Sequence, residues 1–246
     1  MLIFKPSQFV KFLSPRLARF TLGDTDWVFR SPVTAPQKLG LASEYMGYWV
    51  ATRLAVPVPA FDLARMSEPL PQIPLGVGTA TQWIDDHARW PDLEKDPPES
   101  FWVKDTYLEK AAAVRVADTW MMNYDRRKKG NVAICDGHAG PEVYFLDFEQ
   151  AFLSPSEGGG PRHHWVNPEF SDAMLQVRER LSGFLGESTA EHFRPSLQRL
   201  DSVTRMDIGE ALRSMPPEWG ISRSDQLLWT ERLWTRGRIV TEIFPA

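Results

Sequence analysis

Three oxygen-bearing side chains in the middle of the chain have the types and spacing that metal-assisted chemistry needs. Asp125 and Asn131 lie on a polar loop after an expected helix, and Asp147 ends an expected hairpin strand. Side chains on either side of a short hairpin can converge at one of its ends. Magnesium takes oxygen ligands, usually one or two protein carboxylates together with substrate phosphates. An aspartate and an asparagine suffice to hold that ion, which leaves the second aspartate to orient a hydroxyl nucleophile, so the trio indicates phosphoryl transfer.

The same residue types have a second interpretation, because Asp and Asn also favour loops for the hydrogen bonds that they make to their own backbone. A fourth carboxylate, Asp118, falls on the apolar stripe of a helix expected over residues 103–123, four residues after Val114. A carboxylate buried there is costly unless it accepts hydrogen bonds. We therefore expect Asp118 to be a buried supporting acceptor, and the alternative is a frayed helix end in water.

The composition bounds the class of protein. The chain has 246 residues, of which 43% are hydrophobic, a formal net charge of −4 and one cysteine. A disordered chain, a disulfide scaffold and a zinc site built from several cysteines are thereby excluded. The mild acidity gives no electrostatic footprint for nucleic acid, and no apolar run approaches the roughly 18–20 residues of a membrane span. Lys5 and Pro6 interrupt the N-terminal stretch too early for a secretory signal, so we expect a cytoplasmic protein that binds neither nucleic acid nor membrane.

The secondary structure expected to position these residues differs between the first third of the chain and the remainder. Alternating apolar residues between turn signals predict short strands in the first third. These expected strands cover residues 8–13, 19–22, 27–30, 60–66 and 79–84. The first three form an antiparallel meander, and a helix over residues 37–54 separates them from the rest.

The remainder is mainly helical. After a linker over residues 85–100, the helix over residues 103–123 leads to a hairpin whose turn is residues 136–141. A mobile loop is expected over residues 154–161, and helices from residue 167 onward, the last of them capped by Ser222 or Ser224. A sheet-rich first third and a helix-rich remainder predict an α+β fold of two lobes, residues 1–84 and 85–246.

The middle of the chain also resembles a known family. The residues that carry the resemblance are Asn123-Tyr124-Asp125-Arg126, then Asn131, then Leu146-Asp147-Phe148 and Phe152. They resemble the catalytic and metal-binding motifs of HipA-like kinases and are similar to those of type II phosphatidylinositol 4-kinases. The wider protein-kinase group has a DFG motif where this chain has Glu149 in place of the glycine. Residues 44–59 and 215–219 extend the resemblance over most of the chain.

The resemblance implies a bilobal, protein-kinase-like fold with a small antiparallel-sheet N-lobe that binds nucleotide and a mainly helical C-lobe. It implies transfer of the γ-phosphoryl group of ATP, with Mg²⁺, to a hydroxyl acceptor, and a protein serine or threonine is the acceptor expected by analogy. By that match Asp125 is the catalytic base or hydroxyl-orienting residue. Asn131 and Asp147 are the magnesium ligands. Arg126 either stabilises the transferred charge or braces the loop.

The resemblance also assigns nucleotide contacts to the N-lobe. Arg30 stands where the family's strand carries a phosphate-binding lysine, and Glu44 follows at a spacing that suits a strand-to-helix ion pair. Arginine differs from lysine in its bulkier, bidentate fork, and Lys38 is a fallback for the same role. The alternatives are a solvated strand residue and an ordinary surface glutamate. Ser14 and Arg16, in a loop without glycine, are candidates for phosphate contact.

Trp83 ends the N-lobe, where it either stacks on the adenine or simply belongs to the core. Two other function classes stay open. Arg30, the glycine-poor loop and Glu149 favour a catalytically weak pseudokinase that binds nucleotide and acts as an interaction module. The likeness to lipid kinases favours a kinase acting on a lipid or small molecule, against which stands the lack of an amphipathic membrane helix. The expected partners are a nucleotide and a protein acceptor, and an antitoxin-like partner of the kind that accompanies HipA relatives is left open.

Overall fold

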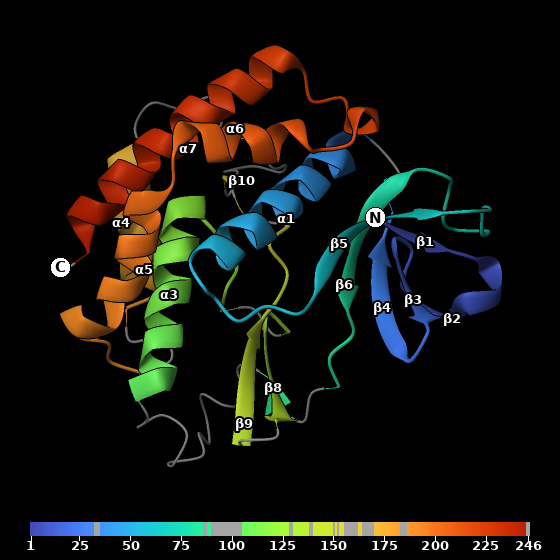
Figure 1. Ribbon diagram of the computed structural model, residues 1–246, viewed down its shortest axis with the longest axis horizontal. Helices are drawn as coiled ribbons and strands as arrows, with labels where there is room; N and C mark the ends of the chain where they lie inside the picture. The colour runs from blue at the N-terminus through green and yellow to red at the C-terminus, as the bar shows by residue number, and fades with distance from the viewer. Residues whose placement is uncertain are drawn as a thin grey trace.

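The fold is a sheet on one side and helices on the other, with helix α1 lying between them (Figure 1). This arrangement confirms the α+β class that the sequence predicts. The computed structural model describes residues 1–31, 35–85, 88–89, 105–127, 130–137, 140–149, 151, 153–154, 162–163, 170–182 and 186–244.

Six strands form the main sheet. They are β1 (Leu2–Phe4), β2 (Phe9–Ser14), β3 (Leu17–Leu22), β4 (Thr25–Arg30), β5 (Phe61–Met66) and β6 (Val77–Gln82). They lie in the order β1-β5-β6-β4-β3-β2, in which β1 pairs with β5 in parallel and the other neighbours are antiparallel. The predicted meander of β2, β3 and β4 is confirmed. Strand β1, followed by the short 3-10 turn η1 (Pro6–Gln8), is an element that the sequence did not predict, because three residues are too few to show alternation.

The two faces of the sheet carry different residues, because successive side chains of a strand point to opposite sides. One face buries a group of aromatic rings, among which Phe20 and Phe29 meet edge-on with 6.2 Å between ring centroids. Arg30, the next residue of β4, points to the other face and lies opposite Thr79 of β6. The strand pattern therefore holds one arginine on the face that looks toward α1.

The helices agree closely with those predicted over residues 37–54 and 103–123 and from residue 167 onward. They are α1 (Ala35–Arg53), α3 (Asp105–Met121), α4 (Phe170–Arg180), α5 (Ala190–Ser202), α6 (Arg205–Arg213) and α7 (Arg223–Ile243), with the 3-10 turn η3 (Pro217–Trp219) before α7. The predicted cap of α7 is present, because the Ser222 Oγ accepts a hydrogen bond from the Asp225 backbone N–H at 3.1 Å. Within the described part of the chain, no helix combines the length and the apolar character needed to cross a bilayer.

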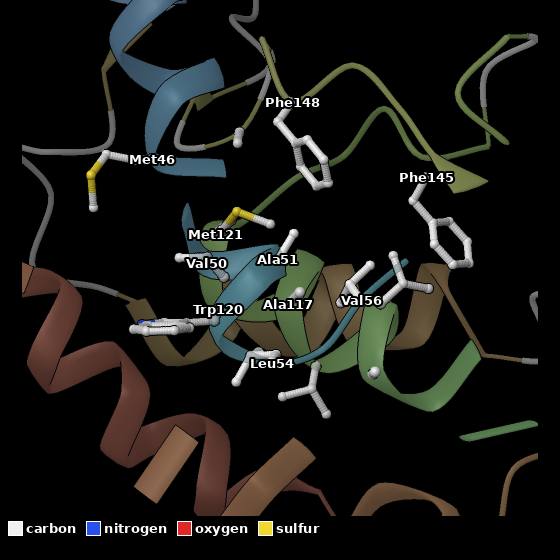
Figure 2. Close-up of a cluster of buried hydrophobic side chains, with 14 of the residues drawn as sticks. Met46, Val50, Ala51, Leu54, Val56, Ala117, Trp120, Met121, Phe145 and Phe148 are labelled. Carbon is white, nitrogen blue, oxygen red and sulfur yellow. The ribbon is translucent and has the colours of Figure 1, made fainter. Parts of the chain in front are cut away.

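Helix α1 shares its hydrophobic core with the helical part of the molecule rather than with the aromatic face of the sheet. Figure 2 shows Val50 of α1 and Leu54, the residue after its end, beside Trp120 and Met121 of α3, with Phe148 pointing toward them. Helix α1 therefore packs mainly with the helical part of the molecule. The division into lobes at residue 84 stays a prediction.

A second sheet has the order β7-β8-β9, with β7 (Ala88–Arg89), β8 (Val132–Gly137) and β9 (Gly140–Phe145). Strands β8 and β9 confirm the predicted hairpin, although they run further into the turn predicted over residues 136–141. Strand β7 shows that the linker predicted over residues 85–100 is wrong at residues 88–89, which pair with β8. Strands β10 (Leu153–Ser154) and β11 (Arg162–His163) also pair, and most of the loop predicted over residues 154–161 lies outside the described residues.

Candidate functional site

A cleft of about 210 Å³ lies between the main sheet and the segment that follows β9. Leu17 and Val28 line it from the sheet, and Leu146 lines it from the segment after β9. Charged side chains also line the cleft, and these are Arg30, Glu44 and Asp147. The cleft therefore combines apolar and ionic side chains, as a site for an amphipathic ligand requires.

A larger groove, of about 830 Å³, lies between the second half of α1 and the segment over residues 54–63. Aromatic side chains such as Trp49 and Phe61 line much of it. Its charged residues, Arg53 and Asp62, each pair with a group outside the groove. None of the site residues predicted from the sequence lines it, so the smaller cleft is the better candidate for chemistry.

The ion pair predicted from the spacing of Arg30 and Glu44 is present in the cleft. The Arg30 Nε lies 3.0 Å from the Glu44 Oε2, and both side chains are largely buried. The Thr79 hydroxyl donates a hydrogen bond to the same carboxylate oxygen at 2.7 Å. These contacts join β4 and β6 to α1, and they rule out a solvated arginine and an ordinary surface glutamate.

Burial sets the electrostatics of this ion pair. Desolvation raises the pKa of Glu44 above its ordinary value, and this outweighs the opposing attraction of Arg30. Burial alone would lower the pKa of Arg30, but the surrounding carboxylates raise it above its ordinary value. Arg30 is therefore a permanent cation in a pocket of carboxylates.

Two further carboxylates reach Arg30 from the segment after β9. The Asp147 Oδ1 lies 3.5 Å from the Arg30 Nη2, and Glu149 pairs with Nη1. Asp147 has a backbone φ of 52°, in the left-handed region that few residues other than glycine adopt. Such backbone persists where the surrounding structure holds it, and it is concentrated at functional sites.

Helix α1 holds this segment through two glycines that are two helical turns apart. A Cβ atom at Gly47 would lie 2.2 Å from the Phe148 Cβ, and one at Gly40 would lie 3.2 Å from the Glu149 Cγ. Phe148 is fully buried in the core that α1 and α3 share (Figure 2). The absence of side chains at both glycines therefore lets residues 148–149 lie directly against the helix.

The turn between β2 and β3 borders the cleft through Leu13 and Leu17 and contains two predicted phosphate contacts. The Ser14 Oγ accepts a hydrogen bond from the Arg16 backbone N–H at 3.3 Å, so it organises the turn. The Arg16 Nη1 lies 3.5 Å from the Glu149 Oε1. A second arginine of the sheet therefore reaches the same carboxylate as Arg30.

Trp83 lines the cleft just beyond the end of β6 and is half-buried, so it is not a core residue. The guanidinium carbon of Arg19 lies 4.5 Å from the centre of its ring, which covers part of the indole. The indole N–H donates to the Asp85 Oδ1 at 2.6 Å. These contacts fix the ring at the edge of the cleft, where its predicted stacking on adenine stays a prediction.

Asn131 and Asp125 are tied to each other beside the cleft without lining it. The Asn131 Nδ2 donates to the Asp125 carbonyl oxygen at 2.8 Å, across the loop that separates them. The Asn131 carbonyl oxygen accepts from the Leu146 N–H at 2.9 Å. Asn131 is therefore next to the residue that precedes Asp147, and the trio predicted from the sequence comes from neighbouring stretches of backbone.

Arg126 is fully buried behind this loop. Its Nε and Nη2 donate to the two carboxylate oxygens of Asp118 at 2.7 and 3.0 Å. Its Nη1 donates to the carbonyl oxygens of Asn131 and Leu146 at 3.0 and 2.6 Å. The prediction that Asp118 is a buried supporting acceptor is confirmed. Of the two roles left open for Arg126, these contacts fit the bracing of the loop, and its place among the catalytic residues becomes a positioning one.

The structure therefore brings most of the predicted site residues together, and it adds Glu149 to them. Sequence reasoning noted Glu149 only as a departure from glycine, yet it is the residue that links Arg16 to Arg30. The side chain of Lys38, the fallback for Arg30, lies outside the described residues. The glycines of α1 were the available signal for Glu149, since two helical glycines spaced by seven residues indicate that another segment approaches the backbone closely.

The oxygen donors of the site fit a magnesium ion. Asp147 supplies a carboxylate, and Asn131 supplies an amide whose nitrogen is already engaged, which leaves its oxygen for a metal. Among the described residues, no group of three or more His, Cys, Asp and Glu side chains could hold a metal. An ion here would therefore need further oxygens from a bound phosphate, as is usual for magnesium.

A sheet that presents a cation to a glutamate of the adjoining helix, above a cleft lined by an aspartate from the segment after β9, is the arrangement of a protein-kinase-like fold. The crystal structure of a Helicobacter pylori proinflammatory kinase, CtkA, has this fold. It matches 98% of this chain and 97% of its own with a TM-score of 0.58, at 12% sequence identity. At that identity the likeness concerns the fold, and the HipA-like resemblance stays a prediction. No protein-family model matches the chain, and no curated protein does.

Proposed function

We propose that this protein is a kinase that transfers the γ-phosphoryl group of ATP, with Mg²⁺, to a hydroxyl acceptor, foremost a protein serine or threonine. The observation that carries the proposal is the buried ion pair of Arg30 and Glu44 in the cleft that Asp147 also lines. Phosphoryl transfer depends on positioning and on charge stabilisation, and a fixed cation beside a metal-binding carboxylate supplies both. The fold shared with the kinase CtkA supports the same function.

The lining of the cleft matches the two kinds of group in a nucleotide. Leu17, Val28 and Leu146 provide apolar surfaces for a base, and Arg30 provides the cation for its phosphates. A bound magnesium ion would neutralise phosphate charge, with Asn131 and Asp147 as its protein ligands.

The two remaining residues, Asp125 and Arg126, act on the acceptor and on the loop that carries Asp125. In this proposal Asp125 orients the acceptor hydroxyl and takes its proton, since it follows the buried helix end that Asp118 and Arg126 fix. Arg126 holds the backbone of the loop and of the segment before Asp147 in one arrangement. The acid and the metal ligands then keep a constant separation through the reaction.

The test is the magnesium-dependent turnover of ATP, with autophosphorylation and with panels of protein and lipid acceptors measured side by side. Asp125→Ala and Asp147→Ala should each lower the rate by at least about 100-fold, the usual effect of removing one stabilising group. Asp201→Ala, which removes an exposed partner of Arg238, is the matched control and should keep full activity. Equal activity in all four proteins would contradict the site assignment.

A second function, nucleotide binding without transfer, is favoured by one observation. Three carboxylates already surround Arg30, so the phosphate-binding cation is engaged in the absence of nucleotide. In that case ATP at 100 times its Kd would raise the free energy of unfolding by about 2.7 kcal/mol, and no acceptor would be phosphorylated. Thermal unfolding with ATP, run beside the turnover assay, separates the two functions.

A further inference from the structure

Glu149 is held as a bound anion between two arginines of the sheet. Its Oε2 pairs with the Arg30 Nη1, and its Oε1 lies 3.5 Å from the Arg16 Nη1. The two arginines come from different elements, β4 and the turn between β2 and β3. Two cationic side chains that converge on one carboxylate form a subsite for an anion, and here a side chain of the protein itself fills it.

The Glu149 side chain fills a particular space beside α1. Its Cγ and Oε1 would lie 3.2 and 3.3 Å from a Cβ atom at Gly40, so the side chain occupies a slot that glycine leaves open on α1. Only about a fifth of the Glu149 side chain is exposed. The carboxylate is therefore seated against a helix and two arginines, unlike an exposed glutamate that happens to pass near a cation.

We propose that the Glu149 carboxylate occupies the subsite for the outer phosphates of a nucleoside triphosphate, and that the nucleotide must displace it to bind. The inference rests on the proposed function, because it assigns Arg30 and Arg16 to those phosphates. Arginine binds carboxylate and phosphate with the same fork geometry, so the two anions compete for the same donors. Glu149 is then the residue that sets how tightly the cleft holds a triphosphate.

If the two anions compete, a change at Glu149 should affect the binding of ATP and of adenosine differently. ATP carries phosphates that need the two arginines, whereas adenosine needs only the apolar side chains of the cleft, Leu17, Val28 and Leu146. Removing the carboxylate charge should therefore strengthen the binding of ATP and leave that of adenosine unchanged. If Glu149 instead supports the phosphate site by orienting Arg30, the same change should weaken the binding of ATP.

The experiment is calorimetric titration of the full chain with ATP and Mg²⁺, and separately with adenosine, for the wild type and Glu149→Gln. We expect the Kd for ATP to fall at least tenfold and the Kd for adenosine to change less than twofold. Glu218→Gln is the matched control, because Glu218 also pairs with an arginine, at 3.4 Å from Arg65, and that arginine does not line the cleft. It should leave both constants unchanged.

Gly40→Ala provides a second route to the same result if Glu149→Gln does not fold. The new methyl group fills the slot on α1 and should push the carboxylate away from the arginines, so ATP should again bind more tightly while adenosine does not. An unchanged or weaker affinity for ATP in the folded variants, or an equal gain for adenosine, overturns the inference and leaves the kinase proposal standing. If neither ligand binds any of the proteins, the proposed function itself fails, and the assignment of the subsite fails with it.

Discussion

Two arginine clusters organise this molecule, and they differ in what surrounds them. The Arg126 cluster consists of Arg126, Asp118 and the carbonyl groups of Asn131 and Leu146, and it has no exposed side chain. The Arg30 cluster consists of Arg30, Glu44, Asp147 and Glu149, and a third of the Asp147 side chain is exposed. The first cluster pairs one cation with one carboxylate, and the second pairs one cation with three.

The difference separates an arginine whose partners are all fixed from one whose partners can exchange. In the Arg126 cluster every donor has a fixed acceptor inside the protein, so nothing can exchange without leaving a buried group unpaired. In the Arg30 cluster three carboxylates share one cation, and Arg30 itself lines the cleft, so a ligand bound there can replace one of them. Residue type alone would not distinguish the two, since both are arginines beside carboxylates.

The largest effect is expected for Asp118→Ala, which removes the only carboxylate of the Arg126 cluster. It leaves a buried guanidinium without its charge partner, and we expect the free energy of unfolding to fall by about 4 kcal/mol. Urea denaturation followed by tryptophan fluorescence measures the change. Asp201→Ala, at an exposed ion pair with Arg238, is the control and should cost less than about 1 kcal/mol. Similar losses in both variants would contradict the contrast.

Exchanging each arginine for lysine tests the comparison directly. Lysine cannot reproduce the bidentate bond to Asp118 together with the two carbonyl bonds, so Arg126→Lys should lower the free energy of unfolding by about 3 kcal/mol. Lysine keeps a positive charge near Glu44, and the remaining carboxylates of the cluster reach water, so Arg30→Lys should cost about 1 kcal/mol. The two variants are compared in the same denaturation assay. A larger loss for Arg30→Lys would show that the cleft cluster is the structural one.

The glycines of α1 give a test of how closely the helix approaches the cleft segment. A methyl group at Gly47 would overlap Phe148, and Gly47→Ala should cost about 2 kcal/mol through overpacking despite the better helix propensity of alanine. Gly237→Ala in α7 is the matched control, because its Cβ would meet atoms at 3.4 Å or more. That variant should be neutral or gain up to about 1 kcal/mol. Thermal unfolding of both proteins measures the difference, and a loss of the same size in each would refute the close approach.

Much of the fold was predictable because apolar residues recur at regular spacing in its longer helices and strands. Helix α1 and the meander of β2, β3 and β4 follow from repeats of apolar residues, which reflect local geometry. Strands β1 and β7 were missed because two or three residues cannot display a period, and only their pairing with β5 and β8 defines them.

The site was predictable where one local rule applied. The pair of Arg30 and Glu44 follows from a strand and a helix that are adjacent in the chain, and the role of Asp118 follows from a polar residue on an apolar stripe. The contact of Glu149 with Arg30 spans 119 residues, and although the glycines of α1 indicate that a segment approaches the helix, no local pattern identifies that segment or its partner. It depends on how the segment after β9 is placed against α1, which is a property of the packed molecule.

The smallest expected effect concerns the pH dependence that Glu44 gives to the Arg30 cluster. Burial raises the pKa of Glu44 in the folded protein above the value of the unfolded chain. At a pH between the two pKa values, the folded state holds a proton that the unfolded state has released. The stability that this group contributes is therefore fully present below the pKa of the unfolded chain. It is lost as the pH rises through the folded pKa.

Glu44→Gln mimics the protonated side chain at every pH and removes this dependence. The free energy of unfolding of the wild type, minus that of Glu44→Gln, should therefore be greatest at acidic pH and fall as the pH is raised toward neutrality. The slope of this difference reports the sign of the pKa shift, since each unit of pKa difference is worth about 1.4 kcal/mol. Paired urea titrations across this range measure it, and other carboxylates cancel in the difference. A difference that grows with pH would mean that Arg30 stabilises the Glu44 carboxylate by more than burial destabilises it, and the cleft cluster would then resemble the fixed pair of Arg126 and Asp118.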